Sequence, residues 1–130
     1  MNTRSLWENS IASLSRLLAE QKVTPSQLVD MYLERCRKIN PKINAFTHID
    51  DEGAREQARL STLRYRQNKR IGPLDGIPIS VKDNIYVRGM NAEWGSLLYK
   101  NNSIDQDDIC VERLRRAGCV ILGKTTTPEF

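Results

Sequence analysis

The segment Cys119–Leu122 is a short, wholly apolar run with a glycine on each side. Such a run is typical of a strand that is buried on both faces, as in a parallel sheet. Earlier in the chain, Ile77–Lys82 carries apolar side chains at alternate positions and predicts a second strand. A helix capped by Asp105 or Asp107 and stopped by Gly118 is expected to connect them. The sequence therefore predicts an α/β fold with a parallel strand pair.

Residues 1–70 are predicted to be mainly helical, and residues 71–130 to begin an α/β core within the same single domain. Thr24-Pro25-Ser26-Gln27 has the pattern of a capping box and opens a helix. We expect this helix to end at Asn40, because the residue before a proline avoids the helical conformation. A short strand at 43–49 and a further helix, from Asp50 or Asp51 to about Asn68, are expected to follow. The buried-type strand needs more sheet neighbours than this stretch supplies, so we expect a sheet that is incomplete here.

Composition and charge exclude several classes of function. The net charge of +4 is modest. The basic residues of the helix predicted from Asp50 or Asp51 onward are not interleaved with aromatic residues at regular spacing. We therefore interpret these basic residues as a solvated helix face and expect no nucleic-acid partner. They are Arg55, Arg59, Arg64, Arg66, Lys69 and Arg70.

The cysteines and the single histidine give no metal or disulfide pattern. Cys36, Cys110 and Cys119 are odd in number and show no CxxC spacing, and His48 has no partner nearby in the sequence. The chain has no apolar run long enough to span a membrane, and its first residues lack the apolar core of a signal peptide. We expect a cytoplasmic protein with no metal and no cofactor.

Lys82 is the candidate for chemistry. It stands at the end of a predicted strand, and strand ends in α/β sheets are where ligand crevices form. Desolvation disfavours an ammonium group, so a lysine in such a crevice can act as a neutral base that activates a serine nucleophile. The alternative is a solvated lysine. For the adjacent Asp83, three roles are open: orienting the loop, pairing with the amine, or capping a turn as a structural carboxylate.

Residues 72–84, Gly-Pro-Leu-Asp-Gly-Ile-Pro-Ile-Ser-Val-Lys-Asp-Asn, resemble the opening motif of the amidase signature family. The segments around 23–35 and 40–46 resemble the helices that precede this motif in the family. Residues 111–125 resemble its next helix and strand, and Pro128-Glu129-Phe130 its following loop. The resemblance covers residues 10–130 in order. It implies the N-terminal part of the amidase signature fold, with helices packed on a mixed β-sheet that is incomplete in this chain.

The resemblance implies a hydrolase that cleaves linear carboxamides through an acyl-enzyme. The family uses a nucleophilic serine, a second serine preceded by a cis peptide bond, and a lysine that corresponds to Lys82. The two serines belong to a Gly/Ser-rich segment beyond this lysine, and residues 1–130 contain no such segment. We therefore expect the 130-residue chain alone to be inactive.

The sequence also departs from the family pattern at 91–96. Asn91-Ala92-Glu93-Trp94 stands where members commonly carry Pro-Thr-Thr before a Gly-Ser pair, although Gly95-Ser96 is retained. We interpret Ser96 as a capping or turn hydroxyl, and not as the nucleophile.

Three functions stay open at this point. The first is an amidase acting on a small-molecule amide. The second is a protein like the amide-hydrolysing subunit of a tRNA-dependent amidotransferase, which would need a partner protein. The third is a non-catalytic truncated remnant. The sequence leaves the oligomeric state open, and a homo-oligomer is one of the alternatives.

Overall fold

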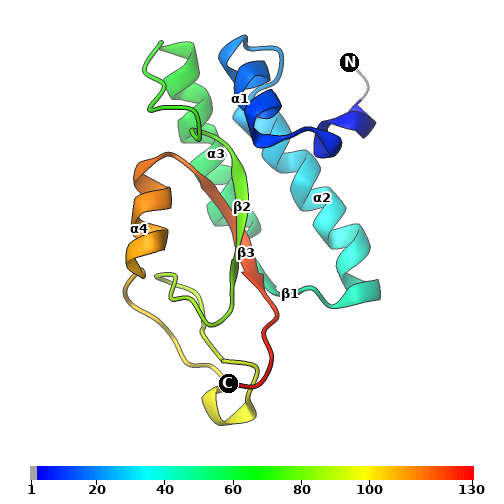
Figure 1. The fold of residues 1–130 in the computed structure, drawn as a ribbon, viewed down its shortest axis with the longest axis vertical. Helices are drawn as coiled ribbons and strands as arrows, with labels where there is room; N and C mark the ends of the chain where they lie inside the picture. Colours follow the sequence, from blue (N-terminus) through cyan, green and yellow to red (C-terminus); the bar gives the residue numbers. More distant parts are fainter. Residues whose placement is uncertain (1–2) are drawn as a thin grey trace.

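The computed structural model describes residues 3–130, with four α-helices, two 3-10 helices and three strands in this part of the chain. Their order along the chain is visible in Figure 1. The elements are η1 (Thr3–Glu8), α1 (Ile11–Ala19), α2 (Pro25–Ile43), β1 (Phe46–Ile49), α3 (Asp51–Arg66), β2 (Pro78–Lys82), η2 (Leu97–Tyr99), α4 (Ile109–Arg116) and β3 (Val120–Thr125).

The three strands form one mixed sheet in the order β1-β3-β2. β2 and β3 are parallel, as the sequence predicts, and β1 pairs with the other edge of β3 in the antiparallel direction. Because β3 is central, its residues Val120–Lys124 are all buried, whereas β2 is an edge strand with Pro78 at its start. The α/β prediction is confirmed.

Helices cover both faces of this sheet (Figure 1). On one face, Val120 and Leu122 of β3 pack against Leu33 of α2 and Ala58 of α3. On the other face, the side chains of Val81, Val87, Met90, Val111 and Ile121 form a cluster that joins β2, β3 and α4. The small buried residues of α3, among them Ala54 and Ala58, let this helix lie close to its neighbours.

The second helix is longer than predicted. Its capping box is present, with Thr24 and Gln27 binding each other's backbone amides. The predicted end at Asn40 is wrong, because α2 continues through Pro41 to Ile43. The proline lies in the last turn, where it removes only one backbone donor. Asn40 secures this end by accepting a hydrogen bond from the Phe46 amide (2.8 Å) and donating one to the Phe46 carbonyl (3.2 Å).

The start of α4 also differs from the prediction. The N-cap is Asp108, not Asp105 or Asp107, and its side chain makes no capping hydrogen bond. The Asp108 carboxylate instead accepts a hydrogen bond from the Tyr86 amide at 2.7 Å. Asp107 accepts one from the Arg88 amide at 2.7 Å and pairs with Arg115. These acids hold the loop that follows β2, a long-range role that local sequence patterns do not reveal.

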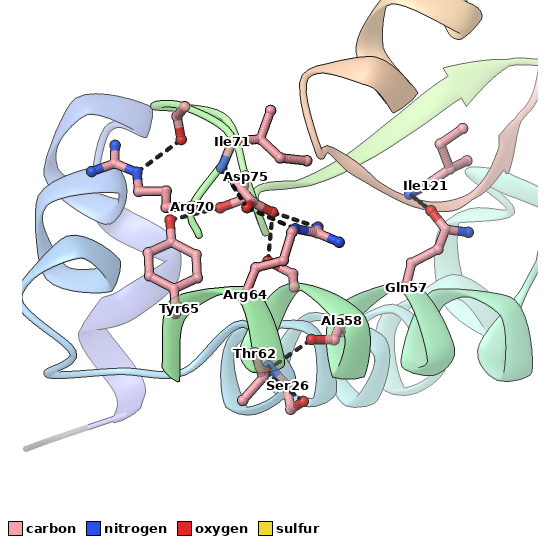
Figure 2. Close-up of polar contacts among 12 residues, drawn as sticks. Ser26, Gln57, Ala58, Thr62, Arg64, Tyr65, Arg70, Ile71, Asp75 and Ile121 are labelled. Atoms are coloured by element: carbon pink, nitrogen blue, oxygen red, sulfur yellow. Dashed lines mark hydrogen bonds and ion pairs between the residues drawn. The ribbon is translucent and has the colours of Figure 1, made fainter. Parts of the chain in front are cut away.

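A buried carboxylate ties α3 to the loop before β2 (Figure 2). Asp75 is fully buried, and its carboxylate accepts two hydrogen bonds from Arg64, at 2.6 and 3.0 Å. It also accepts one from the Ser61 hydroxyl (2.7 Å) and one from the Ile71 amide (3.0 Å). The Tyr65 hydroxyl donates to the Asp75 carbonyl at 2.9 Å. The prediction that Arg64 belongs to a solvated face is therefore wrong, because the arginine is drawn to this carboxylate.

Burial by itself raises the pKa of Asp75. The hydrogen bonds from Arg64, Ser61 and the Ile71 amide, with the charge of Arg64, outweigh burial and hold the pKa below its ordinary value. Gly118 closes α4 with a φ of +88°, and a Cβ there would lie 2.7 Å from the Asp75 carboxylate. A glycine is thus needed at this helix end both for its backbone angle and for space.

No helix among residues 3–130 is long and apolar enough to cross a membrane. The three cysteines, Cys36, Cys110 and Cys119, are all free.

Asp75→Asn in the complete gene product should lower the free energy of unfolding by about 3 kcal/mol at pH 7, because Arg64 loses its buried charged partner. The folded-state pKa of Asp75 is lowered, so its contribution is present above the unfolded pKa of about 3.9 and is lost as the pH falls through the folded value. Denaturant unfolding should therefore show a difference in the free energy of unfolding between the wild type and Asp75→Asn, and this difference should become smaller in acid. The exposed Asp105→Asn is the control, and an equally small loss in both variants would contradict the prediction.

The 130-residue chain on its own should expose an apolar surface. Leu97 and Leu98 of η2 are 88% and 83% exposed, and Ile109 and Phe130 are also largely exposed. We expect this chain to bind a hydrophobic dye and to self-associate, and a Leu97→Ser/Leu98→Ser variant to do both less. Light scattering after size exclusion provides the measurement. A monodisperse monomer without dye binding would show the prediction to be wrong.

Candidate active site

Lys82 is the last residue of β2, at the carboxyl end of the parallel strand pair, where its register partner is Thr125 of β3. The alternation of the strand buries Val81 against α4 and leaves the side chains of Ser80 and Lys82 exposed. Among the described residues Lys82 is therefore a solvated lysine, the alternative that the sequence leaves open, and not a desolvated lysine in a crevice. The structure places it at a strand end, where the sequence predicts it.

Asp83 follows at once and is buried, with only 2% of its surface exposed. Its Oδ2 atom accepts hydrogen bonds from the amides of Glu93 (2.9 Å) and Trp94 (2.8 Å), and its own amide donates to the Thr125 carbonyl (2.8 Å). Of the three roles left open by the sequence, the structure supports a carboxylate that caps a turn and thereby orients the loop, and no ion pair with the Lys82 amine is present among residues 3–130. Asp83 fastens the 93–94 turn to the end of β2.

The structure adds a residue that sequence reasoning does not select, Lys124 of β3. Its side chain is fully buried, and its Nζ donates to the carbonyls of Asp83 (3.0 Å) and Asn91 (3.1 Å). Burial lowers the pKa of Lys124, and the charges of Asp83 and Asp108 oppose that effect. The signal in the sequence is a lysine directly after a buried apolar strand, but it does not show which groups the lysine reaches.

Gly123 gives Lys124 its direction. The pairing of β2 with β3 shifts by one residue at this point, from Ile79 opposite Ile121 to Ser80 opposite Gly123. This bulge turns Lys124 to the same side as Val81, toward the 83–104 loop. A Cβ at Gly123 would lie 2.1 Å from the His48 carbonyl oxygen, so only glycine lets β1 approach here.

Ser96 has the capping role that the sequence predicts. It is the N-cap of η2, where its hydroxyl accepts from the Leu98 amide (3.4 Å) and donates to Glu129 (3.0 Å). It lines a hollow of about 260 Å³ beyond the ends of β2 and β3. The other residues of this hollow are mostly polar: Thr47, Asp83, Glu93, Gly95, Leu97, Lys100, Thr126 and Thr127.

His48 lies in β1 beside a neighbouring hollow of about 190 Å³, which Asp83 and Asn91 also line. Among residues 3–130, no three His, Cys, Asp or Glu side chains gather into a set that could hold a metal ion.

A family model described as Amidase matches residues 27–130, most of the chain. The chain belongs to the amidase family. The resemblance found in the sequence motifs is thus confirmed, and the helices and mixed sheet described above are part of the amidase signature fold.

Curated relatives in this family are named as the A subunit of glutamyl-tRNA(Gln) amidotransferase. The protein from Nitrosomonas europaea is 39% identical over 121 residues, and the protein from Salinispora arenicola is 35% identical over 121 residues. In both cases the match covers 93% of this chain and 25% of the relative. The chain thus spans about a quarter of the length of the curated relatives it matches.

Solved amidase structures share the arrangement of this chain. A native peptide amidase from Stenotrophomonas maltophilia matches with a TM-score of 0.89 and 31% identity, over 98% of this chain and 26% of that one. An amidase family protein from Bacillus anthracis matches with a TM-score of 0.88 and 27% identity, again over 98% and 26%. This part of the amidase fold is therefore closely reproduced.

The hydrogen bonds between Asp83 and the 93–94 amides should stabilise the complete gene product. Asp83→Ala removes the acceptor of two backbone amides and should lower the free energy of unfolding by about 2 kcal/mol. Hydrogen exchange of the Glu93 and Trp94 amides should become faster, whereas Asp83→Asn, which keeps one acceptor oxygen, should change both less. Asp105→Ala is the matched control, and unchanged exchange at 93–94 in Asp83→Ala would contradict this account.

Proposed function

We propose that the protein is an amide-bond hydrolase in which Lys82 is the base of an acyl-enzyme mechanism. The observation that carries the proposal is the place of Lys82 within this family member, at the carboxyl end of parallel strand β2 and within the 72–84 motif. Ligand crevices of α/β sheets lie at such strand ends.

The mechanism needs two serines that residues 1–130 do not supply in a Gly/Ser-rich segment. A nucleophilic serine oxygen would attack the amide carbon while its proton passes through a bridging serine to the neutral Lys82 amine. The same relay would return a proton to the departing ammonia or amine, leaving an acyl-serine ester. Water would then attack the ester carbon and pass a proton through the relay to Lys82, and the relay would return a proton to the serine oxygen as the carboxylic acid departs.

Two lysines stand near the end of the sheet, and their surroundings favour Lys82 as the base. Lys124 is fully enclosed and its Nζ already binds two carbonyl oxygens. The Lys82 side chain is exposed, so a serine and a substrate from another part of the protein could reach it. The exposed lysine is therefore assigned to proton transfer.

The proposed substrates are linear carboxamides, as the resemblance of the 72–84 motif to the amidase signature family implies, and the similar solved structures include a peptide amidase. A second candidate, the amide-hydrolysing subunit of a tRNA-dependent amidotransferase, is favoured by the name of the curated relatives and by their identity of up to 39%. Assaying the complete gene product for ammonia release from free carboxamides, without any partner protein, separates the two. Release without a partner supports the amidase, and release that depends on a partner supports the amidotransferase component.

We also propose that the protein works in the cytoplasm, as its free cysteines suggest, and acts on small-molecule amides without binding nucleic acid itself. A homo-oligomer is compatible with this function, and light scattering of the complete protein would test it.

Lys82→Ala in the complete gene product should lower kcat by about 10³-fold or more, because removing the base disables the coupled nucleophile. Lys82→Arg should be nearly as damaging, since a guanidinium does not give up its proton at working pH. Lys38→Ala, at an exposed position of α2, is the control. A folded Lys82→Ala protein with ordinary turnover would remove Lys82 from the mechanism.

A further inference from the structure

Lys124 occupies an energetically unfavourable position. Its side chain is fully buried, yet among residues 3–130 no carboxylate lies within ion-pair distance of its Nζ. Burying an ammonium costs free energy, and a methionine or leucine would fill the same space without that cost. The partners of the Nζ show what the position provides: they are two backbone carbonyls, those of Asp83 and Asn91.

These two carbonyls belong to the segment that leaves the candidate base. Asp83 is the residue directly after Lys82, and Asn91 lies in the loop that returns past the strand end. The Asp83 amide is held by the Thr125 carbonyl, its carbonyl by Lys124, and its carboxylate by the amides of the 93–94 turn. The amide, the carbonyl and the carboxylate of Asp83 are therefore all hydrogen-bonded, and the donor to the carbonyl is the Lys124 side chain.

Resting on the proposed role of Lys82, we propose that Lys124 is a positioning residue that fixes the backbone after Lys82 and thereby the direction of the Lys82 amine. A lysine side chain is flexible. Movement of its backbone would add to this flexibility, so a rigid backbone narrows the range of positions that the Lys82 amine can take. The bulge at Gly123 puts Lys124 on the Val81 side of the sheet, while Lys82 points to the other side. Lys124 therefore acts through the Asp83 backbone and does not touch the reacting atoms.

The test uses the complete gene product with a primary carboxamide as substrate. Four variants are compared with the wild type: Lys124→Met, Lys82→Ala, the double variant, and Lys38→Met as an exposed control. We expect Lys124→Met to lower kcat by up to about 100-fold with little change in KM, because small displacements of a catalytic group have effects of this size. Hydrogen exchange at the 93–94 amides should become faster, and Lys38→Met should behave as the wild type.

The double variant separates positioning from general stability. If Lys124 acts through Lys82, the double variant should be no slower than Lys82→Ala alone. A further loss of rate in the double variant, or a folded Lys124→Met with wild-type kcat, would overturn the inference while leaving the role of Lys82 intact. Ordinary turnover in Lys82→Ala would instead overturn the proposed function, and this inference with it.

Lys124→Gln covers the case in which Lys124→Met does not fold. Its side-chain amide can still donate to a carbonyl. If both variants fold, we expect the kcat of Lys124→Gln to lie between those of Lys124→Met and the wild type. If only Lys124→Gln folds, we expect its kcat to be well below that of the wild type. Failure of both variants to fold would assign Lys124 to stability alone and overturn the inference.

Discussion

The Asp75 carboxylate holds the two parts of this chain together. It lies in the loop before β2, where Arg64, Ser61 and the Ile71 amide bind it, and Gly118 packs against it from the end of α4. A carboxylate without water needs all its hydrogen bonds from the protein, and these donors come from α3 and the loop that follows it. The helical layer and the start of the parallel strands are therefore placed relative to each other by one charged group.

Local patterns in the sequence predict most of the elements because each one carries its own chemical cause. The capping box at Thr24 starts α2, and the apolar run at 119–122 becomes the buried strand β3. The errors occur where a distant partner decides. Pro41 stays helical because Asn40 binds Phe46, and Asp107 and Asp108 hold the 85–88 loop where a helix cap was expected.

The candidate site shows the same division. Strand alternation and the 72–84 motif predict the place of Lys82 at a strand end, which the structure has, whereas its role as the base stays a prediction. The buried Lys124 is missed, because its role depends on a bulge and on two carbonyls that lie 41 and 33 residues away in the sequence. Arg64 is misplaced for a similar reason, since a helical pattern cannot show that a carboxylate 11 residues later turns back toward it.

The bulge at Gly123 also separates two like charges. Without the one-residue shift, the register Ile79–Ile121 would continue to place Lys124 directly opposite Lys82. Neighbouring strands are about 4.8 Å apart, so two ammonium groups would share one face and repel each other. With the shift, Thr125 takes that place and Lys124 turns to the opposite face. A single extra residue thus divides a lysine pair into a buried member and an exposed one, which lie on opposite faces of the sheet.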